Sequence, residues 1–167
     1  MLKKITCCFT GHRIMPADLK TIQSELRNYL CSLINDGFIY FGSGGALGFD
    51  MLAAETVLQL KKSYPHIKLS MILPCPNQDR FWTQEQKNKY KIILTAADEI
   101  IYTSDTYYKG CMQKRNRCLV DSASCVLAYL ERNTGGTKYT VDYANKTGVN
   151  VQFLLSSQMQ GQQLSFC

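Results

Sequence analysis

A run of closely spaced glycines is the part of this sequence best suited to bind an anion. Residues 41–50 read Phe-Gly-Ser-Gly-Gly-Ala-Leu-Gly-Phe-Asp, with a short apolar run before them and a helix-like pattern after them. Glycine adopts backbone angles that other residues avoid and lets a ligand approach the main chain closely. Where a strand turns into a helix, free N–H groups and the helix dipole favour a phosphate. The segment therefore predicts a phosphate or nucleotide site, although a tight turn in an ordinary α/β domain would use the same residues.

Two more segments combine glycine with polar or cationic side chains. Gly11, His12 and Arg13 follow the first apolar run, and a fixed cation beside a hydrogen-bond donor suits a phosphate or carboxylate. Residues 135–137, Gly-Gly-Thr, precede a helical pattern and offer bare N–H groups and a capping hydroxyl. The alternative for the first segment is a surface turn with an exposed arginine. Together with residues 41–50, the two segments predict an anionic ligand of nucleotide size.

Other polar side chains have predicted roles around that ligand. Arg115 would bring positive charge to a phosphate, while Asp50 and Asn116 would hold a ribose or orient loops. For Asp50 the residues favour another role, interaction with the free N–H groups and the dipole at the start of a helix. Gln78 and Trp82 would bond to a base and stack on it, although Trp82 also suits helix packing. The predicted ligand-binding residues are Gly11, His12, Arg13, Ser43, Gly44, Gly45, Gly48, Asp50, Gln78, Trp82, Arg115, Asn116, Gly135, Gly136 and Thr137.

Strand-like and helix-like patterns that alternate along the chain must position these residues. The predicted strands are 5–10, 38–41, 68–73, 99–103, 125–130 and 149–154. The predicted helices are 18–35, 49–64, 84–97, 111–121 and 137–147. This alternation predicts an α/β fold, a single Rossmann-like domain with a doubly wound, mainly parallel sheet of about six strands and helices on both faces. In such sheets ligands bind beyond the carboxyl ends of the strands, which is where the candidate loops fall.

Composition sets the broad class of protein. The chain has 167 residues, of which 46% are apolar, and this suits one domain with a hydrophobic core. We expect that domain over residues 1–155 and a polar C-terminal tail over residues 156–167. No apolar run approaches the roughly 20 residues that span a bilayer, and the N-terminus resembles a first strand more than a signal peptide. We therefore expect a cytoplasmic protein with free thiols and no membrane partner.

The net charge and the positions of the histidines indicate which partners and metals to expect. The formal net charge of +6 favours anionic partners in general, but the basic residues are too dispersed to define a nucleic-acid patch. Neither of the two histidines has a cysteine or histidine at the spacing of a zinc site, so we expect no metal.

In this order, the candidate segments resemble the SLOG superfamily, which joins the DNA-processing protein A fold to the LOG phosphoribohydrolases. Within it the chain looks like the small YpsA-like group, the DUF1273 family. The matching pieces, which span nearly the whole chain, are residues 11–13, 43–50, 74–75 with Gln78 and Trp82, 115–116 and 135–137. The resemblance implies a Rossmann-like domain that binds nucleotides or derivatives such as NAD or ADP-ribose-like molecules at these loops. It also implies a homodimer, since members of the superfamily often dimerise.

One departure concerns the phosphoribohydrolases, which resemble one another in a Pro-Gly-Gly-x-Gly-Thr motif followed closely by a glutamate. Here residues 135–137 are followed by Lys138, Tyr139 and Thr140, and the nearest downstream carboxylate is Asp142. Cleavage of a glycosidic bond needs an acid, a base or a stabilising carboxylate. Asp50, Glu55 and Asp142 could be proposed for that role, but none matches the motif.

The sequence therefore favours binding of a nucleotide or nucleotide derivative, as a sensor or ligand-handling module that requires no cofactor. Two alternatives stay open. A phosphoribohydrolase would cleave the N-glycosidic bond of a nucleoside 5′-monophosphate. Single-strand nucleic-acid binding would show a steep loss of affinity with salt, but the dispersed charge and the isolated Trp82 favour it less.

Overall fold

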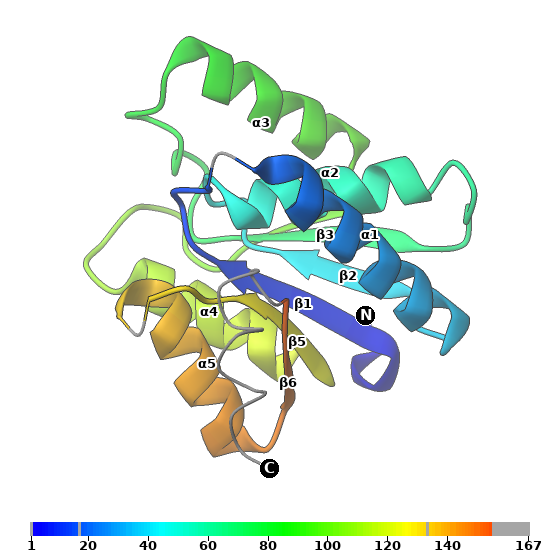
Figure 1. Cartoon of the computed structure of the whole chain (residues 1–167). Helices are drawn as coiled ribbons and strands as arrows, with labels where there is room; N and C mark the ends of the chain where they lie inside the picture. Colours follow the sequence, from blue (N-terminus) through cyan, green and yellow to red (C-terminus); the bar gives the residue numbers. More distant parts are fainter. Residues whose placement is uncertain (1, 17, 133, 155–167) are drawn as a thin grey trace.

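A six-stranded parallel sheet forms the middle layer of the computed structural model (Figure 1). Its strands lie side by side in the order β4-β3-β2-β1-β5-β6. Their bounds are β1 (Thr6–Gly11), β2 (Tyr40–Ser43), β3 (Lys68–Leu73), β4 (Glu99–Tyr102), β5 (Cys125–Tyr129) and β6 (Asn150–Phe153). The structure describes residues 2–16, 18–132 and 134–154, so the predicted tail 156–167 lies outside the described residues. The predicted Rossmann-like α/β fold is confirmed.

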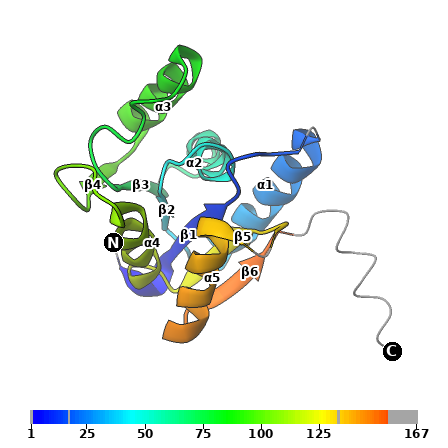
Figure 2. The same ribbon diagram turned by 90° about the vertical axis from the view of Figure 1, so that its left-hand side faces the viewer.

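Five helices cover the two faces of this sheet. They are α1 (Leu19–Asn35), α2 (Phe49–Leu60), α3 (Gln84–Ala96), α4 (Cys111–Asp121) and α5 (Gly135–Thr147). Helix α2 packs against α1 and α3, while α4 packs against α5 on the other face (Figures 1 and 2). Crossovers between parallel strands are right-handed, so the change of direction from β1–β4 to β5–β6 puts the two groups of helices on opposite faces.

Alternating side chains of the strands build an apolar core on each face. In β1, Cys7 and Phe9 face the cluster under α1 and α2, whereas Cys8 faces the smaller cluster under α4 and α5. Helix α1 contributes a buried stripe that includes Ile22 and Leu26. Because both faces are covered, β1 and β5 are buried along nearly their whole length, and β5 is built of apolar residues, as is typical of parallel sheets.

The order of the strands creates a switch point between β1 and β5. The chain moves outward from β1 to β4 and then returns to the opposite side of β1 to form β5. The loop after β1 leads to a helix on one face, and the loop after β5 leads to a helix on the other. Ligands of doubly wound sheets bind in the crevice that such diverging loops leave.

Three elements have boundaries that differ from the sequence-based prediction by two or more residues. The second strand begins at Tyr40 because Phe38 belongs to the end of α1, where its N–H donates to the carbonyl of Leu33 after Gly37 at φ 91°. Helix α2 ends at Leu60, and residues 61–63 continue as turns. Helix α5 begins at Gly135, so both glycines of the 135–137 segment lie in its first turn.

Features of other protein classes are absent from residues 2–16, 18–132 and 134–154. Within them, no helix has the length and apolarity that a membrane span requires. The seven cysteines in these ranges are free thiols. No group of three or more metal-ligating side chains gathers among the residues described.

Candidate functional site

A cavity of about 190 Å³ opens at the carboxyl ends of β1 and β5, at the switch point. Three loops and α4 form its walls. Its lining residues are Thr10, Gly11, His12, Arg13, Ala46, Asp50, Met112, Arg115, Asn116, Thr134, Gly135, Gly136 and Thr137. The structure thus brings nine of the predicted ligand-binding residues together around one cavity.

A buried ion pair forms the floor of the cavity. Arg115 Nη1 lies 3.2 Å from Asp50 Oδ2, and the two side chains are only 5% and 7% exposed. Burial raises the pKa of Asp50, while Arg115 and the backbone amide of Ala46 oppose that shift. Burial likewise lowers the pKa of Arg115, and Asp50 opposes it. Since a buried charge is costly unless it is paired, each residue of this pair depends on the other.

Arg115 keeps hydrogen-bonding capacity beyond that ion pair. Its guanidinium has five N–H donors, of which Nη1 meets Asp50 and Nη2 lies 3.9 Å from Met112 Sδ. The buried Nε has no hydrogen-bond partner among the residues that the structure describes. An unpartnered buried donor is destabilising, and an anion in the cavity would accept from this side chain.

The glycine loop makes room for the ion pair. A Cβ at Gly44 would lie 1.2 Å from Arg115 Nη1, so a larger residue would push the guanidinium away from Asp50. Ser43 Oγ donates to the carbonyl of Asp50 at 2.9 Å and accepts from the N–H of Gly45 at 3.1 Å. Gly45 itself has φ 62°, in the left-handed region. Ser43, Gly44 and Gly45 therefore shape the floor without lining the cavity.

The loop after β1 passes directly over the start of α2. The N–H of Phe49 donates to the carbonyl of His12 at 3.1 Å. A Cβ at Gly48, where φ is 83°, would lie 2.4 Å from the carbonyl oxygens of His12 and Arg13. A Cβ at Gly11 would lie 2.4 Å from Phe49 Cβ. These glycines let the main chain of the two loops come close together, and Gly48 stands behind the cavity wall.

His12 joins the loop after β1 to the loop after β5. Its Nε2 accepts from the N–H of Glu131 at 2.9 Å and from the N–H of Arg132 at 3.0 Å, so this nitrogen must be unprotonated. Burial lowers the pKa of His12 and Arg132 lowers it further, whereas Glu131 opposes the shift. The Tyr129 hydroxyl donates to Glu131 Oε1 at 2.5 Å, and the Tyr129 ring meets His12 edge-on. His12 thus positions two cavity walls relative to each other.

The loop after β3 supports the glycine loop from behind. Gln78 Nε2 donates to the carbonyls of Gly44 and Gly45 at 3.4 and 3.2 Å and to the Tyr90 hydroxyl at 2.7 Å. Trp82 packs edge-on against Tyr90, with ring centroids 5.1 Å apart. The structure therefore places Gln78 and Trp82 outside the cavity lining, and the helix-packing role open to Trp82 is the one seen.

The wall at α5 presents main-chain groups. Gly135 and Gly136 are exposed, Thr137 is buried, and a Cβ at Gly136 would have nothing within 4 Å. Thr134 precedes the helix, and its side chain makes no capping bond within the described chain. The first N–H groups of α5 are therefore left for another acceptor.

The carboxylates considered for catalysis lie in different surroundings. Among the described lining residues, Asp50 carries the only carboxylate. Asp142 is exposed on α5 and pairs with Lys138, and Glu55 pairs with Lys89 at 3.0 Å, so neither lines the cavity. Sequence reasoning named no role for four lining residues, which are Thr10, Ala46, Met112 and Thr134. The position of Met112 three residues before Arg115, on the same helical face, was the available signal.

A match to a known protein family covers most of this chain. Residues 10–159 match the YpsA model, described as the YspA SLOG family. The chain belongs to this family. Its predicted resemblance to SLOG proteins is thus confirmed.

Individual relatives agree with this assignment. The chain is 36% identical over 140 residues to a UPF0398 protein of Brevibacillus brevis, in a match that covers 82% of this chain and 74% of that protein. It is 36% identical over 119 residues to the SPbeta prophage-derived protein YoqJ of Bacillus subtilis. That match covers 64% of this chain and 70% of YoqJ.

Solved structures show the same fold. DNA processing protein A of Streptococcus pneumoniae matches with a TM-score of 0.67 and 17% identity over 96% of this chain. That match covers 53% of the pneumococcal chain, so the YpsA-family chain spans about half its length. DNA processing protein A of Helicobacter pylori, whose structure was described for its single-stranded DNA binding mode, matches with a TM-score of 0.66 and 19% identity. This second match covers 95% of the present chain and 73% of the other.

Proposed function

We propose that this chain binds a nucleotide or nucleotide derivative, with a phosphate group in the cavity at the switch point. The observation that carries the proposal is the spare hydrogen-bonding capacity of the buried Arg115 at the cavity floor. The side chain is 5% exposed, so water satisfies it poorly. A phosphate oxygen would accept from it in a charge-assisted bond.

The main chain supports the same assignment. The start of α5 has no side-chain cap within the described residues, and its glycines leave open space above the N–H groups. A helix N-terminus of this kind attracts anions through its free donors and its dipole. The exposed Arg13 adds a cation at the rim.

The size of the cavity indicates which part of the ligand enters it. Its volume of about 190 Å³ is below the roughly 300–1,000 Å³ of pockets that enclose a whole drug-sized molecule. We expect it to hold a phosphate and part of a sugar, with Asp50 and Asn116 beside the ribose, while the base lies outside. A site that binds the phosphate and sugar in this way suits a sensor or ligand-handling role.

A thermal-shift screen tests the proposal. The purified protein, shown to be free of carried-over ligand, is heated with AMP, ADP, ATP, NAD, ADP-ribose and inorganic phosphate. A ligand at about 100 times its dissociation constant stabilises by about 2.7 kcal/mol, which is roughly 5–10 °C for a chain of this size. A shift confined to a few nucleotides supports the proposal, and no shift with any of them contradicts it.

A second candidate function is single-strand nucleic-acid binding. It is favoured by the fold shared with DNA processing protein A and by the net charge of +6. Its signature would be a steep fall of affinity as salt rises, because several phosphates would release counterions.

Hydrolysis is the remaining alternative, and Asp50 is the residue on which it would depend. This carboxylate lines the cavity, but it is engaged by Arg115. Release of adenine and ribose 5-phosphate from AMP by the original protein, but not by Asp50→Asn, would show that the chain is a hydrolase.

The superfamily resemblance also implies a homodimer. This remains a prediction, which size-exclusion chromatography with light scattering tests.

A further inference from the structure

Three aromatic side chains stand in solvent on two adjoining loops at the carboxyl ends of the strands. Phe81, in the loop after β3, is 85% exposed, and Tyr107 and Tyr108, in the loop after β4, are 49% and 45% exposed. Strands β3 and β4 are neighbours in the sheet, so their loops adjoin. Single exposed apolar residues are common, but a group of aromatic rings at a surface usually marks a binding site.

Arg80 links the aromatic rings of the two loops. Its guanidinium carbon lies 4.4 Å from the centroid of the Phe81 ring and 4.9 Å from that of Tyr107. These are cation–π distances, so the arginine holds the rings in a defined arrangement despite their exposure. We call Arg80, Phe81, Tyr107 and Tyr108 the aromatic platform.

Neighbouring side chains fix the loops that carry the aromatic platform. Lys87 Nζ donates to the carbonyl of Arg80 at 3.3 Å, and Lys114 Nζ donates to the carbonyl of Thr103 at 2.5 Å. The two loops and the start of α4 carry cations that outnumber the acidic residues. The cations are Arg80, Lys109 and Lys114, and the acidic residues are Asp79 and Asp105. The platform is thus anchored and modestly basic.

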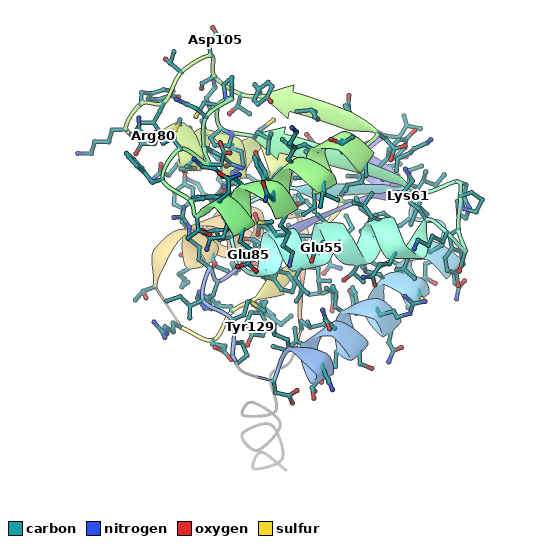
Figure 3. All side chains as sticks on the ribbon, turned by 90° about the horizontal axis from the view of Figure 1, so that it is seen from above. Glu55, Lys61, Arg80, Glu85, Asp105 and Tyr129 are labelled. Carbon is teal, nitrogen blue, oxygen red and sulfur yellow. The ribbon has the colours of Figure 1, made fainter. Side chains whose placement is uncertain are left out.

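The platform and the cavity lie along the same side of the sheet. In Figure 3, Arg80 and Asp105 lie toward the same side as Tyr129, at the end of β5, and opposite to Lys61 at the far end of α2. Gln78 joins the loop after β3 to the glycine loop, and Lys114 directly precedes Arg115 of the cavity floor. A ligand longer than one nucleotide could therefore reach both.

We infer that the aromatic platform stacks unpaired bases of a single-stranded nucleic acid. This inference rests on the second candidate function, single-strand nucleic-acid binding. It names residues for that function that the family comparison does not name. Flat rings stack on any base because every base has a π-face, and the cation of Arg80 adds to that attraction. The cavity is assigned to a phosphate and part of a sugar, so the bases of a bound strand would find their contacts outside it. A duplex hides the faces that stacking requires.

Fluorescence anisotropy with a labelled oligothymidylate of about twenty nucleotides tests the inference. Stacking of one base is worth about 1–3 kcal/mol, so Phe81→Ala should weaken binding by roughly 5- to 150-fold. Tyr107→Ala should also weaken it. The matched control is Ile92→Ala, which removes an exposed apolar side chain of α3 outside the platform (69% exposed). This control should bind like the original protein, and the same strand annealed to its complement should bind more weakly.

Several results would overturn the inference. Phe81→Ala with unchanged affinity would do so, as would an equal loss in Ile92→Ala or equal binding of the duplex. The thermal shift given by mononucleotides should survive in Phe81→Ala; its loss there would assign the platform to the base of a single bound nucleotide and not to a strand. Mononucleotide binding without any oligonucleotide binding removes this inference alone, whereas absence of both removes the nucleotide proposal as well.

Discussion

The helices of this domain begin in two different ways, and the difference follows the cavity. Helices α1 and α3, which lie away from it, are capped by their own side chains: Asp18 accepts from the N–H of Thr21 at 3.3 Å, and Thr83 and Gln86 form a capping box. Helices α2, α4 and α5, which line it, begin after Gly48, Gly110 and Thr134 without a side-chain cap in the described chain.

The comparison indicates where the sequence leaves hydrogen-bond donors for a ligand. The N-caps of α2 and α4 are glycines, which cost only about a few tenths of a kcal/mol relative to a capping side chain. Thr134 of α5 is of a capping type, yet its side chain makes no capping bond in the described chain. The first N–H groups of α2 and α4, those of Phe49 and Cys111, already donate to the carbonyls of His12 and Tyr108. An anion would therefore replace the missing cap at the start of α5. In this view the capped helices serve the fold and the uncapped helices serve the site.

The largest expected effect comes from breaking the ion pair that joins two of the uncapped helices. Asp50→Asn removes the negative charge 3.2 Å from the buried Arg115 and leaves that cation unpaired. We expect the free energy of unfolding to fall by about 3–5 kcal/mol in urea denaturation. The control is Asp142→Asn, which breaks the exposed pair with Lys138 and should cost less than about 0.5 kcal/mol. Equal effects of the two substitutions would show that the Asp50–Arg115 pair is not essential to the domain.

Substitutions can remove a cap from a capped helix and add one to an uncapped helix. Thr83→Ala removes the capping box of α3 and should lower stability by about 0.5–2 kcal/mol without changing nucleotide affinity. Thr134→Asp adds a capping carboxylate to α5, so we expect unchanged or higher stability, by up to about 1 kcal/mol, together with weaker nucleotide binding. Thermal unfolding and nucleotide titration of both variants measure this. The comparison fails if Thr134→Asp binds nucleotide as tightly as the unmodified protein.

The smallest expected effect is a pH dependence from His12. Its pKa is lowered from 6.5 in the folded protein because burial disfavours the charged ring, and Nε2 accepts two main-chain bonds. The stabilisation is therefore fully present above the unfolded pKa of 6.5 and is lost as pH falls through the lower folded pKa. Between about pH 7.5 and pH 5, stability should fall more steeply in the original protein than in His12→Gln. Identical slopes in the original protein and in His12→Gln would rule out this role of His12.

The sequence was sufficient for the fold because its evidence is local. Alternating apolar runs and helical stripes need only short-range periodicity, and the glycine segments marked the ends of β1, β2 and β5. Nine predicted residues meet at one cavity because parallel strands bring their carboxyl ends to the same edge.

The remainder of the site depends on contacts that no local pattern contains. Asp50 and Arg115 are 65 residues apart, so neither the pair nor the need for Gly44 beneath it could be read from spacing. Trp82 and Phe81 are neighbours in the sequence, yet one packs on Tyr90 and the other faces solvent. Which of two adjacent aromatic residues is exposed is decided by the tertiary packing of α3.

A nucleotide titration of a matched pair of variants at Gly136 tests the central claim most directly. This glycine is exposed at the uncapped start of α5, and a Cβ there meets nothing within 4 Å, so Gly136→Ala and Gly136→Asp should both fold. Calorimetric titration with AMP, ADP and ADP-ribose should show binding by the original protein and by Gly136→Ala. In Gly136→Asp we expect at least about a tenfold loss, because like charges placed together cost several kcal/mol. Unchanged nucleotide affinity in Gly136→Asp would contradict an anion site at this helix start.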